Sequence, residues 1–162
     1  VIYAVIGPAA YSDAAGGKRV TESVIAAGAD IIFGQGNGSS FGMLQAVETT
    51  KAPDGGKAYF IDVIGDKTSI DKGFLLSSVV WDLTPVYTAM INDLKAGSYG
   101  SRNYDINLAD GSLHLLKTAN IPDDVWASVQ EIQAQVASGA IVVEKKYDAE
   151  SVHAMVTTVE AN

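Results

Sequence analysis

Three short apolar runs separated by amphipathic segments constrain the fold more than any other feature of this sequence. Val1–Ile6, Asp30–Phe33 and Ala58–Val63 are nearly all apolar, which is typical of strands buried on both faces of a sheet. The segments between them repeat apolar residues at near-helical spacing: Val20, Val24 and Ala27 in the first, and Phe41, Leu44 and Val47 in the second. An alternation of strand, helix, strand, helix and strand, with right-handed crossovers, predicts a parallel α/β sheet.

The second half of the chain continues this pattern less regularly. We expect a fourth strand over Phe74–Trp81, then a helix that Thr84 caps, with Pro85 at its first position and Gly97 at its end. Further along, the pattern predicts a hairpin over residues 103–116 with its turn at Asp110-Gly111, and then a long helix over residues 122–139. A short strand over residues 141–143 and a terminal helix over residues 152–159 are expected to follow. The prediction is a single α/β domain over residues 1–162, with three α/β/α layers around a mainly parallel sheet and one short hairpin.

Composition excludes several classes of function. The chain has 11 Lys and Arg against 19 Asp and Glu, a formal charge of −8, and so lacks the basic surface that binding of nucleic acid requires. It has no Cys, which removes disulfides and thiol catalysis, and neither His114 nor His153 has a partner at metal-ligand spacing. No run approaches the roughly 18–20 apolar residues that span a bilayer. We expect no metal, no cofactor, no nucleic-acid partner and no catalytic residue set.

The glycine-rich loop from Gly34 to Gly42 is the most informative local feature. It leaves the carboxyl end of a predicted parallel strand and enters a helix, which is where open α/β sheets bind ligands. Backbone amides at Gly36, Asn37, Gly38 and Ser39 suit an oxygen-rich or anionic group. The spacing of the glycines matches neither the dinucleotide fingerprint nor the P-loop. A plain tight turn explains the loop equally well, and the sequence leaves both interpretations open.

Other polar and aromatic residues fall at the same predicted edge. The loop of Tyr11, Ser12 and Asp13 follows the first run, where the ring can stack on a planar ligand and the polar groups can hydrogen-bond it. The alternative is a helix cap by Asp13 beside a half-buried Tyr11. Trp81 has the same two interpretations, as a ligand wall or as part of the core. Asp62 and Asp66 flank a strand end, where solvated loop carboxylates are the commoner case.

Taken in order, five segments resemble the basic membrane protein (BMP) family of substrate-binding lipoproteins. These segments are Tyr11–Lys18, Gly28–Phe33, Leu76–Val80, Leu94–Gly97 and Ile121–Val125. The resemblance covers nearly all of this chain and about the C-terminal half of a family member. It implies a lobe of a type I periplasmic binding protein, located outside the cytoplasm, that serves an ABC transporter or a sensor. Because the chain begins at Val1 rather than Met, we also expect that a signal, an anchor or a preceding domain has been removed.

The resemblance also implies a ligand and a set of contacts. Several family members bind purine nucleosides in a cleft between two lobes, with the base stacked on aromatic rings. The expected ligand-binding residues are Tyr11, Ser12, Asp13, Gly36, Asn37, Gly38, Ser39, Asp66 and Trp81. Two positions depart from the family: Ile64 stands where nucleoside receptors carry an Asp that grips the sugar, and Trp81 where they carry a Lys. These departures favour a flat, uncharged small molecule over a free ribose.

The family architecture raises a question about partners. The helix after Trp81 usually belongs to the other lobe, so its apolar face needs a missing lobe, a partner chain or a fold-back onto this sheet. A homo-oligomer is compatible with the same feature. Besides a substrate-binding module, the sequence leaves open a non-catalytic interaction or assembly domain with no working cleft, and an α/β enzyme is the least favoured alternative.

Overall fold

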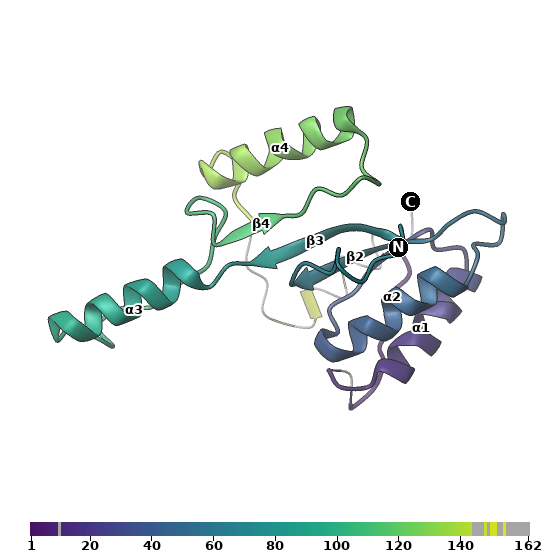
Figure 1. The fold of residues 1–162 in the computed structure, drawn as a ribbon, viewed down its shortest axis with the longest axis horizontal. Helices are drawn as coiled ribbons and strands as arrows, with labels where there is room; N and C mark the ends of the chain where they lie inside the picture. The colour runs from purple at the N-terminus through teal and green to yellow at the C-terminus, as the bar shows by residue number, and fades with distance from the viewer. Residues whose placement is uncertain (10, 144–147, 149, 152–153, 155–162) are drawn as a thin grey trace.

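The computed structural model describes residues 1–9, 11–143, 148, 150–151 and 154. The terminal helix predicted over residues 152–159 lies outside these residues, apart from Ala154. The elements are α1 (Ala14–Ala26), β1 (Ile31–Phe33), the short 3-10 helix η1 (Asn37–Ser39), α2 (Ser40–Thr49), β2 (Tyr59–Ile64), β3 (Leu75–Trp81), α3 (Thr84–Ala96), β4 (Leu113–Leu115) and α4 (Asp123–Ala137) (Figure 1).

The sheet has the order β1-β2-β3-β4. β1 pairs with β2 and β2 with β3 in parallel, and β4 adds an antiparallel edge next to β3. The predicted α/β class with a mainly parallel sheet is therefore confirmed. Because β1, β2 and β3 run the same way, the loops that follow them emerge at one edge of the sheet, which we call the carboxyl edge.

The core lies between the sheet and the pair α1 and α2, which pack side by side against it (Figure 1). Ile25 of α1, Phe60 of β2 and Leu75 of β3 are fully buried at its centre. The two helices approach so closely that a side chain on Gly42 of α2 would collide with the backbone oxygen of Ala14 at the start of α1. This contact brings the N-terminal ends of α1 and α2 together at the carboxyl edge.

The first apolar run does not form a strand. Residues 1–6 run without regular structure, and Val1, Tyr3 and Val5 are exposed. An apolar run is suited to burial, but a strand also needs a neighbour for its backbone groups. Here β1 is an edge strand that pairs with β2 on one side, and residues 1–6 do not pair with its other side. The strand predicted over residues 141–143 is wrong as well, since these residues are exposed and not in a strand.

The hairpin predicted between residues 103 and 116 is also wrong. Only Leu113–Leu115 is a strand, and its ladder is with β3. Residues 103–108 form no strand, and a single backbone hydrogen bond, from the Leu113 amide to the Asn107 oxygen at 3.0 Å, links them to β4. Side chains in the intervening loop account for this difference. The Asn107 Oδ1 accepts hydrogen bonds from the amides of Ala109 and Asp110, at 2.9 and 3.0 Å, and so forms a compact turn in place of a first arm.

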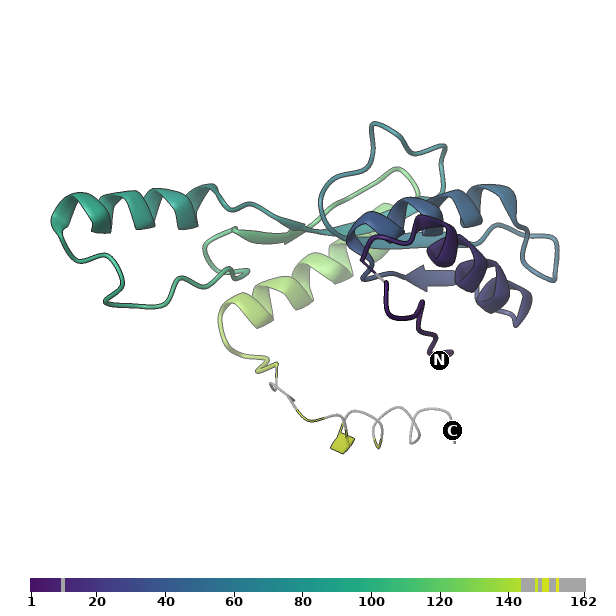
Figure 2. The same cartoon turned by 90° about the horizontal axis from the view of Figure 1, so that it is seen from below.

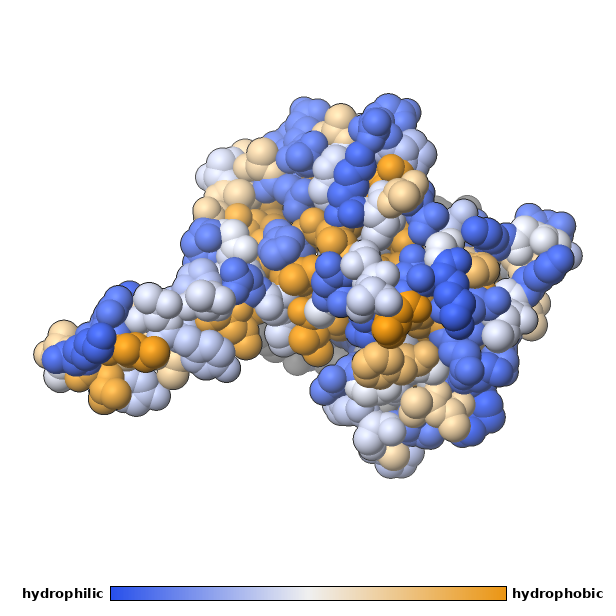
Figure 3. Space-filling model, viewed as in Figure 1, coloured by the Kyte–Doolittle hydropathy of each residue, from blue (hydrophilic) through white to orange (hydrophobic). Residues whose placement is uncertain are grey.

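α3 projects from the carboxyl edge away from the rest of the molecule (Figures 1 and 2). It has no buried residue, and hydrophobic residues lie among hydrophilic ones along the projecting arm in the space-filling view (Figure 3). The predicted helix is confirmed, with Gly97 at its end in the left-handed conformation at φ 71°. Its capping group differs from the prediction, because the amide of Thr84 donates to the Asp82 carboxylate at 2.9 Å.

α4 matches the predicted long helix and also has no buried residue. One side of it, together with Leu108 and Leu115, lines an open apolar groove of about 460 Å³. Within the described residues, no helix combines the length and the apolar composition that crossing a bilayer would take.

The helix contact at Gly42 generates a prediction about stability. Gly42→Ala forces a methyl group into the Ala14 backbone, so α1 and α2 must separate, and we expect a loss of about 1–3 kcal/mol in the free energy of unfolding. Urea denaturation measures this loss. Gly65→Ala is the matched control, because nothing lies within 4 Å of its added methyl group. Equal stability of the two variants would contradict the close contact.

Candidate functional site

The carboxyl edge of the sheet gathers three of the loops that the sequence singled out. The glycine loop follows β1, the loop with Asp66 follows β2, and Trp81 is the last residue of β3. α3 leaves from this edge as well (Figure 1). We take this edge as the candidate site, since ligands of open α/β sheets bind outside the carboxyl ends of the strands.

Tyr11 and the glycine loop lie side by side. The amide of Gly38 donates a hydrogen bond to the backbone oxygen of Tyr11 at 3.1 Å. A methyl group on Gly38 would lie 2.9 Å from that same oxygen, so the approach requires glycine. The Tyr11 side chain is 72% exposed and does not pack as a half-buried residue. An exposed ring beside a backbone turn is the arrangement that stacking on a planar ligand requires.

Within the glycine loop of residues 34–42, three side chains are exposed: those of Gln35, Asn37 and Phe41. Ser39 is fully buried, and its hydroxyl donates to the backbone oxygen of Gly36 at 2.8 Å. Ser40 closes the next turn by donating to the backbone oxygen of Asn37 at 2.5 Å. The Ser39 hydroxyl therefore holds the shape of the turn. The amides of Gly38 and Ser39 donate to backbone oxygens of the protein, so the expectation that they bind a ligand is wrong. The side chains of Gln35 and Asn37 remain as exposed polar groups of the loop.

Asp13 is the N-cap of α1. Its carboxylate accepts a hydrogen bond from the amide of Gly16 at 2.7 Å and lies 3.7 Å from the guanidinium of Arg19. The capping interpretation of Asp13 is thus confirmed. Ser12 is exposed, and its hydroxyl donates to the backbone oxygen of Ala9 at 3.3 Å. Both residues adjoin Tyr11 at the candidate site.

Asp66 and Trp81 are both exposed at the carboxyl edge. The Asp66 carboxylate accepts from the amide of Thr68 at 2.7 Å, and the side chain and amide of Thr68 hold the pKa of this carboxyl below its usual value. Asp66 is therefore ionised at neutral pH. The Trp81 side chain is 42% exposed, so it is not part of the core.

Backbone strain is concentrated at the same edge. Among the described residues, the non-glycine positions with positive φ are Asn37, at 47°, and Ile64, at 81°. The first lies in the loop after β1, and the second is the last residue of β2. Asn tolerates this region, but a β-branched residue there is strained by about 1–3 kcal/mol. Strain of this kind tends to accumulate at ligand-binding sites.

Asp62 is not the solvated loop acid that the sequence analysis expected. It is fully buried on β2, and its Oδ2 forms an ion pair with Lys67. Lys67 also lies over the ring of Phe41, with 5.2 Å between its Nζ and the ring centroid. The sequence analysis missed Lys67 altogether. The available signal was a charged residue inside an apolar strand, which needs a partner when it is buried.

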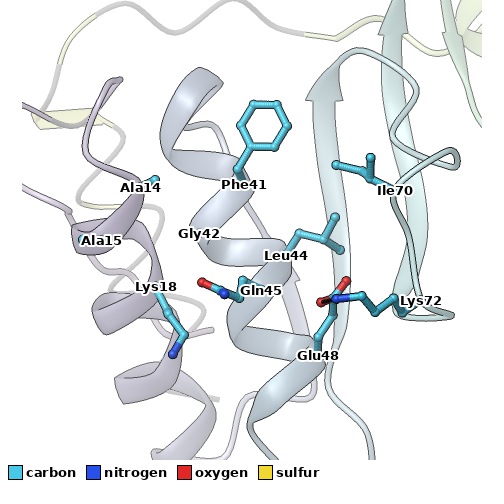
Figure 4. Close-up of a pocket in the computed structure, with 10 residues that line it drawn as sticks. All are labelled: Ala14, Ala15, Lys18, Phe41, Gly42, Leu44, Gln45, Glu48, Ile70 and Lys72. Atoms are coloured by element: carbon cyan, nitrogen blue, oxygen red, sulfur yellow. Dashed lines mark hydrogen bonds and ion pairs between the residues drawn. The ribbon is translucent and has the colours of Figure 1, made fainter.

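A second hollow of about 530 Å³ lies on the outer side of α1 and α2 (Figure 4). Phe41 and Ile70 lie along it, and the ion pair of Lys72 with Glu48, at 2.6 Å, lies at its lower end in this view. None of the ligand-binding residues expected from the sequence lines this hollow. Within the part of the chain that the structure describes, no cluster of three or more His, Asp or Glu could hold a metal ion.

Comparison with known proteins places the fold. No protein-family model matches the sequence, and no curated protein matches it either. A structure described as an ABC transporter solute-binding protein from Aeropyrum pernix K1 aligns with 93% of this chain and 50% of its own, with a TM-score of 0.75 and 18% identity. A second such protein, from Conexibacter woesei DSM 14684, aligns with 85% of this chain and 45% of its own, with a TM-score of 0.63 and 20% identity.

A third similar structure is described as a transcriptional activator of the comK gene from Bacillus halodurans. It aligns with 83% of this chain and 46% of its own, with a TM-score of 0.67 and 18% identity. The chain thus spans about half the length of these three neighbours. At such identities the likeness shows a shared fold alone, and none of the three is described as a BMP family member.

The environment of Asp66 generates a prediction about its ionisation. Thr68→Val removes the hydroxyl that stabilises the charged carboxylate, so the pKa of Asp66 should rise toward its usual value, as followed by carboxyl NMR titration. Ser69→Ala, one residue further along, should leave that pKa unchanged. Because the folded pKa is lowered, the stabilisation it represents is present at neutral pH and disappears as the pH falls through the folded pKa. An unaltered pKa in Thr68→Val would contradict this assignment.

Proposed function

We propose that this chain is a ligand-binding lobe of an extracytoplasmic substrate-binding protein that serves an ABC transporter or a sensor. The observation that carries the proposal is the contact between Gly38 and Tyr11. It sets an exposed aromatic ring beside a glycine turn at the carboxyl edge of a parallel sheet. The shared fold with two proteins described as ABC transporter solute-binding proteins supports this role.

The proposed ligand is a flat, uncharged, nucleoside-like molecule. Tyr11 and Trp81 supply exposed aromatic surface, and the exposed side chain of Asn37 supplies a hydrogen-bond donor and an acceptor. Asp66 supplies an ionised acceptor for hydroxyl or amino groups. Ile64 offers no charge at the position where the BMP family carries its sugar-binding Asp. The residues at this edge therefore favour stacking on a base over strong hydrogen bonding to sugar hydroxyls. Membership of the BMP family is part of this proposal.

The second wall of the cleft is proposed to come from another lobe. α3 has no buried residue, and Tyr87, Ile91 and Leu94 are exposed along it. Burying such a face yields about 25 cal/mol for each Å² of apolar surface removed from water. We therefore infer that α3 packs into the second lobe, and that ligand binding between the lobes shifts the protein toward a closed form that the transporter or sensor recognises.

The exposed face of α3 also supports a second candidate, a non-catalytic assembly domain. In that case α3 mediates association, for example between two copies of the chain, and the carboxyl edge binds no ligand. The two candidates differ in their response to small molecules. The assembly domain oligomerises with no effect of any ligand on its melting temperature, whereas the binding lobe is stabilised by its ligand.

A thermal-shift screen of nucleosides, free bases and small aromatic metabolites tests the proposed function. A ligand at one hundred times its dissociation constant adds about 2.7 kcal/mol to the stability of the folded state. Tyr11→Ala should abolish this stabilisation because it removes the stacking ring. Tyr3→Ala, which removes an exposed tyrosine outside the candidate site, should preserve it. A flat response to the whole panel, together with self-association, would favour the assembly domain.

The role of α3 leads to a separate prediction. Ile91→Asp places a charge on the apolar face of α3, so it should block lobe closure and abolish the compaction that ligand causes in small-angle X-ray scattering. Asn92→Asp adds a charge at the exposed neighbouring position and should leave compaction intact. Since α3 has no buried residue, neither variant should change the stability of the sheet and its core. Normal compaction in Ile91→Asp would exclude α3 from the interface between lobes.

A further inference from the structure

Two buried polar side chains face one another across the centre of the sheet. Asp62 of β2 and Ser78 of β3 are paired in the parallel register, and both are fully buried. Nearby strand positions, such as Phe60 and Leu75, are filled by apolar side chains. Asp62 lies two residues before the end of β2, which the loop with Asp66 follows, and Ser78 lies in the middle of the neighbouring strand β3.

Both side chains reach that loop, and they hold the residues on either side of Asp66. The hydroxyl of Ser78 donates to the backbone oxygen of Gly65 at 2.7 Å. The Asp62 carboxylate pairs with Lys67, whose side chain is only 13% exposed. Asp66 therefore sits between two neighbours that are fixed to the interior of the sheet, while its own carboxylate stays in solvent.

This arrangement lowers the stability of the folded protein, and packing of the apolar core does not require it. The Asp62 Oδ1 is buried and accepts no hydrogen bond from the described residues. A buried ion pair is often no more stabilising than an apolar pair of similar volume, and a buried oxygen without a partner is rare in folded proteins. The strained Ile64, at φ 81°, begins the same segment. Several energetically unfavourable features in one segment indicate that the conformation of this segment serves a function.

We propose that Asp62 and Ser78 are positioning residues that hold Asp66 in its ligand-binding conformation, with Lys67 as the link to Asp62. This inference rests on the proposed function for its use, although the geometry of the loop can be measured without any ligand. A loop fixed in advance loses less conformational entropy when ligand binds, so affinity is higher than with a mobile loop.

Amide hydrogen exchange in the intact protein tests the geometry. The readout is the amide of Thr68, which donates to Asp66 Oδ1. The double variant Asp62→Leu/Lys67→Met replaces the ion pair by apolar side chains, so the core keeps its packing while the loop loses its link. We expect exchange at Thr68 to accelerate at least about tenfold. Ser78→Ala, a smaller change that frees Gly65, should act in the same direction.

Two further variants separate positioning from general destabilisation. Lys67→Arg keeps the cation and should retain slow exchange at Thr68. Lys72→Gln removes an exposed ion pair from the same loop and should also leave this exchange unchanged, because Lys72 is 73% exposed. Unaltered exchange at Thr68 in both Asp62→Leu/Lys67→Met and Ser78→Ala would overturn the inference. Should the double variant fail to fold, Ser78→Ala alone decides it.

Calorimetry with adenosine as the probe then links the loop to binding. If the wild-type protein binds adenosine, we expect the double variant to bind it about tenfold more weakly and Lys67→Arg to bind it normally. Unchanged affinity in a double variant with a mobile loop would overturn the positioning role. If the wild-type protein binds no adenosine, the nucleoside part of the proposed function fails, whereas the exchange measurements still decide whether Asp62 and Ser78 fix the loop.

Discussion

The close approach of α1 to α2 is the contact on which the rest of the site depends. Because Gly42 carries no side chain, α2 can rest directly on the backbone at the start of α1. This contact carries Tyr11, just before α1, to the turn that precedes α2, where the amide of Gly38 donates to its backbone oxygen. A helix contact in the outer layer thus brings together two loops that are separated in sequence by an entire helix and strand.

Burial is unevenly distributed over this fold. The core between the sheet and the pair α1 and α2 is fully formed, with Phe60 and Leu75 at its centre. By contrast, α3 and α4 have no buried residue, and the chain spans about half the length of the similar structures. The exposed face of α3 begins at the same edge as the candidate ligand contacts, which is why we connect ligand capture with packing between lobes.

Local sequence patterns were most informative where local interactions decide the structure. The helices were predictable because their caps and apolar spacing act within one or two turns, as Asp13 and Gly97 illustrate. Predictions failed where a strand needs a distant partner. Val1–Ile6 has the composition of a buried strand but no pairing neighbour, and the ladder of Leu113–Leu115 is with β3 rather than with the residues before it. Which strands pair depends on contacts across the whole sheet between residues distant in sequence, and apolar periodicity within one segment does not reveal them.

The sequence by itself determined the α/β class, most of the element order and the candidate loops at the ends of the strands, because short-range spacing and turn residues encode these features. Only the tertiary structure decided which side chains in those loops face solvent and which hold the turns. The Ser39 hydroxyl is buried and bonded within the turn that it stabilises, whereas the Tyr11 ring is exposed and available for stacking. Asp62 differs from Asp66 for the same reason: burial and the approach of Lys67 depend on how β2, β3 and α2 pack, which no run of neighbouring residues specifies.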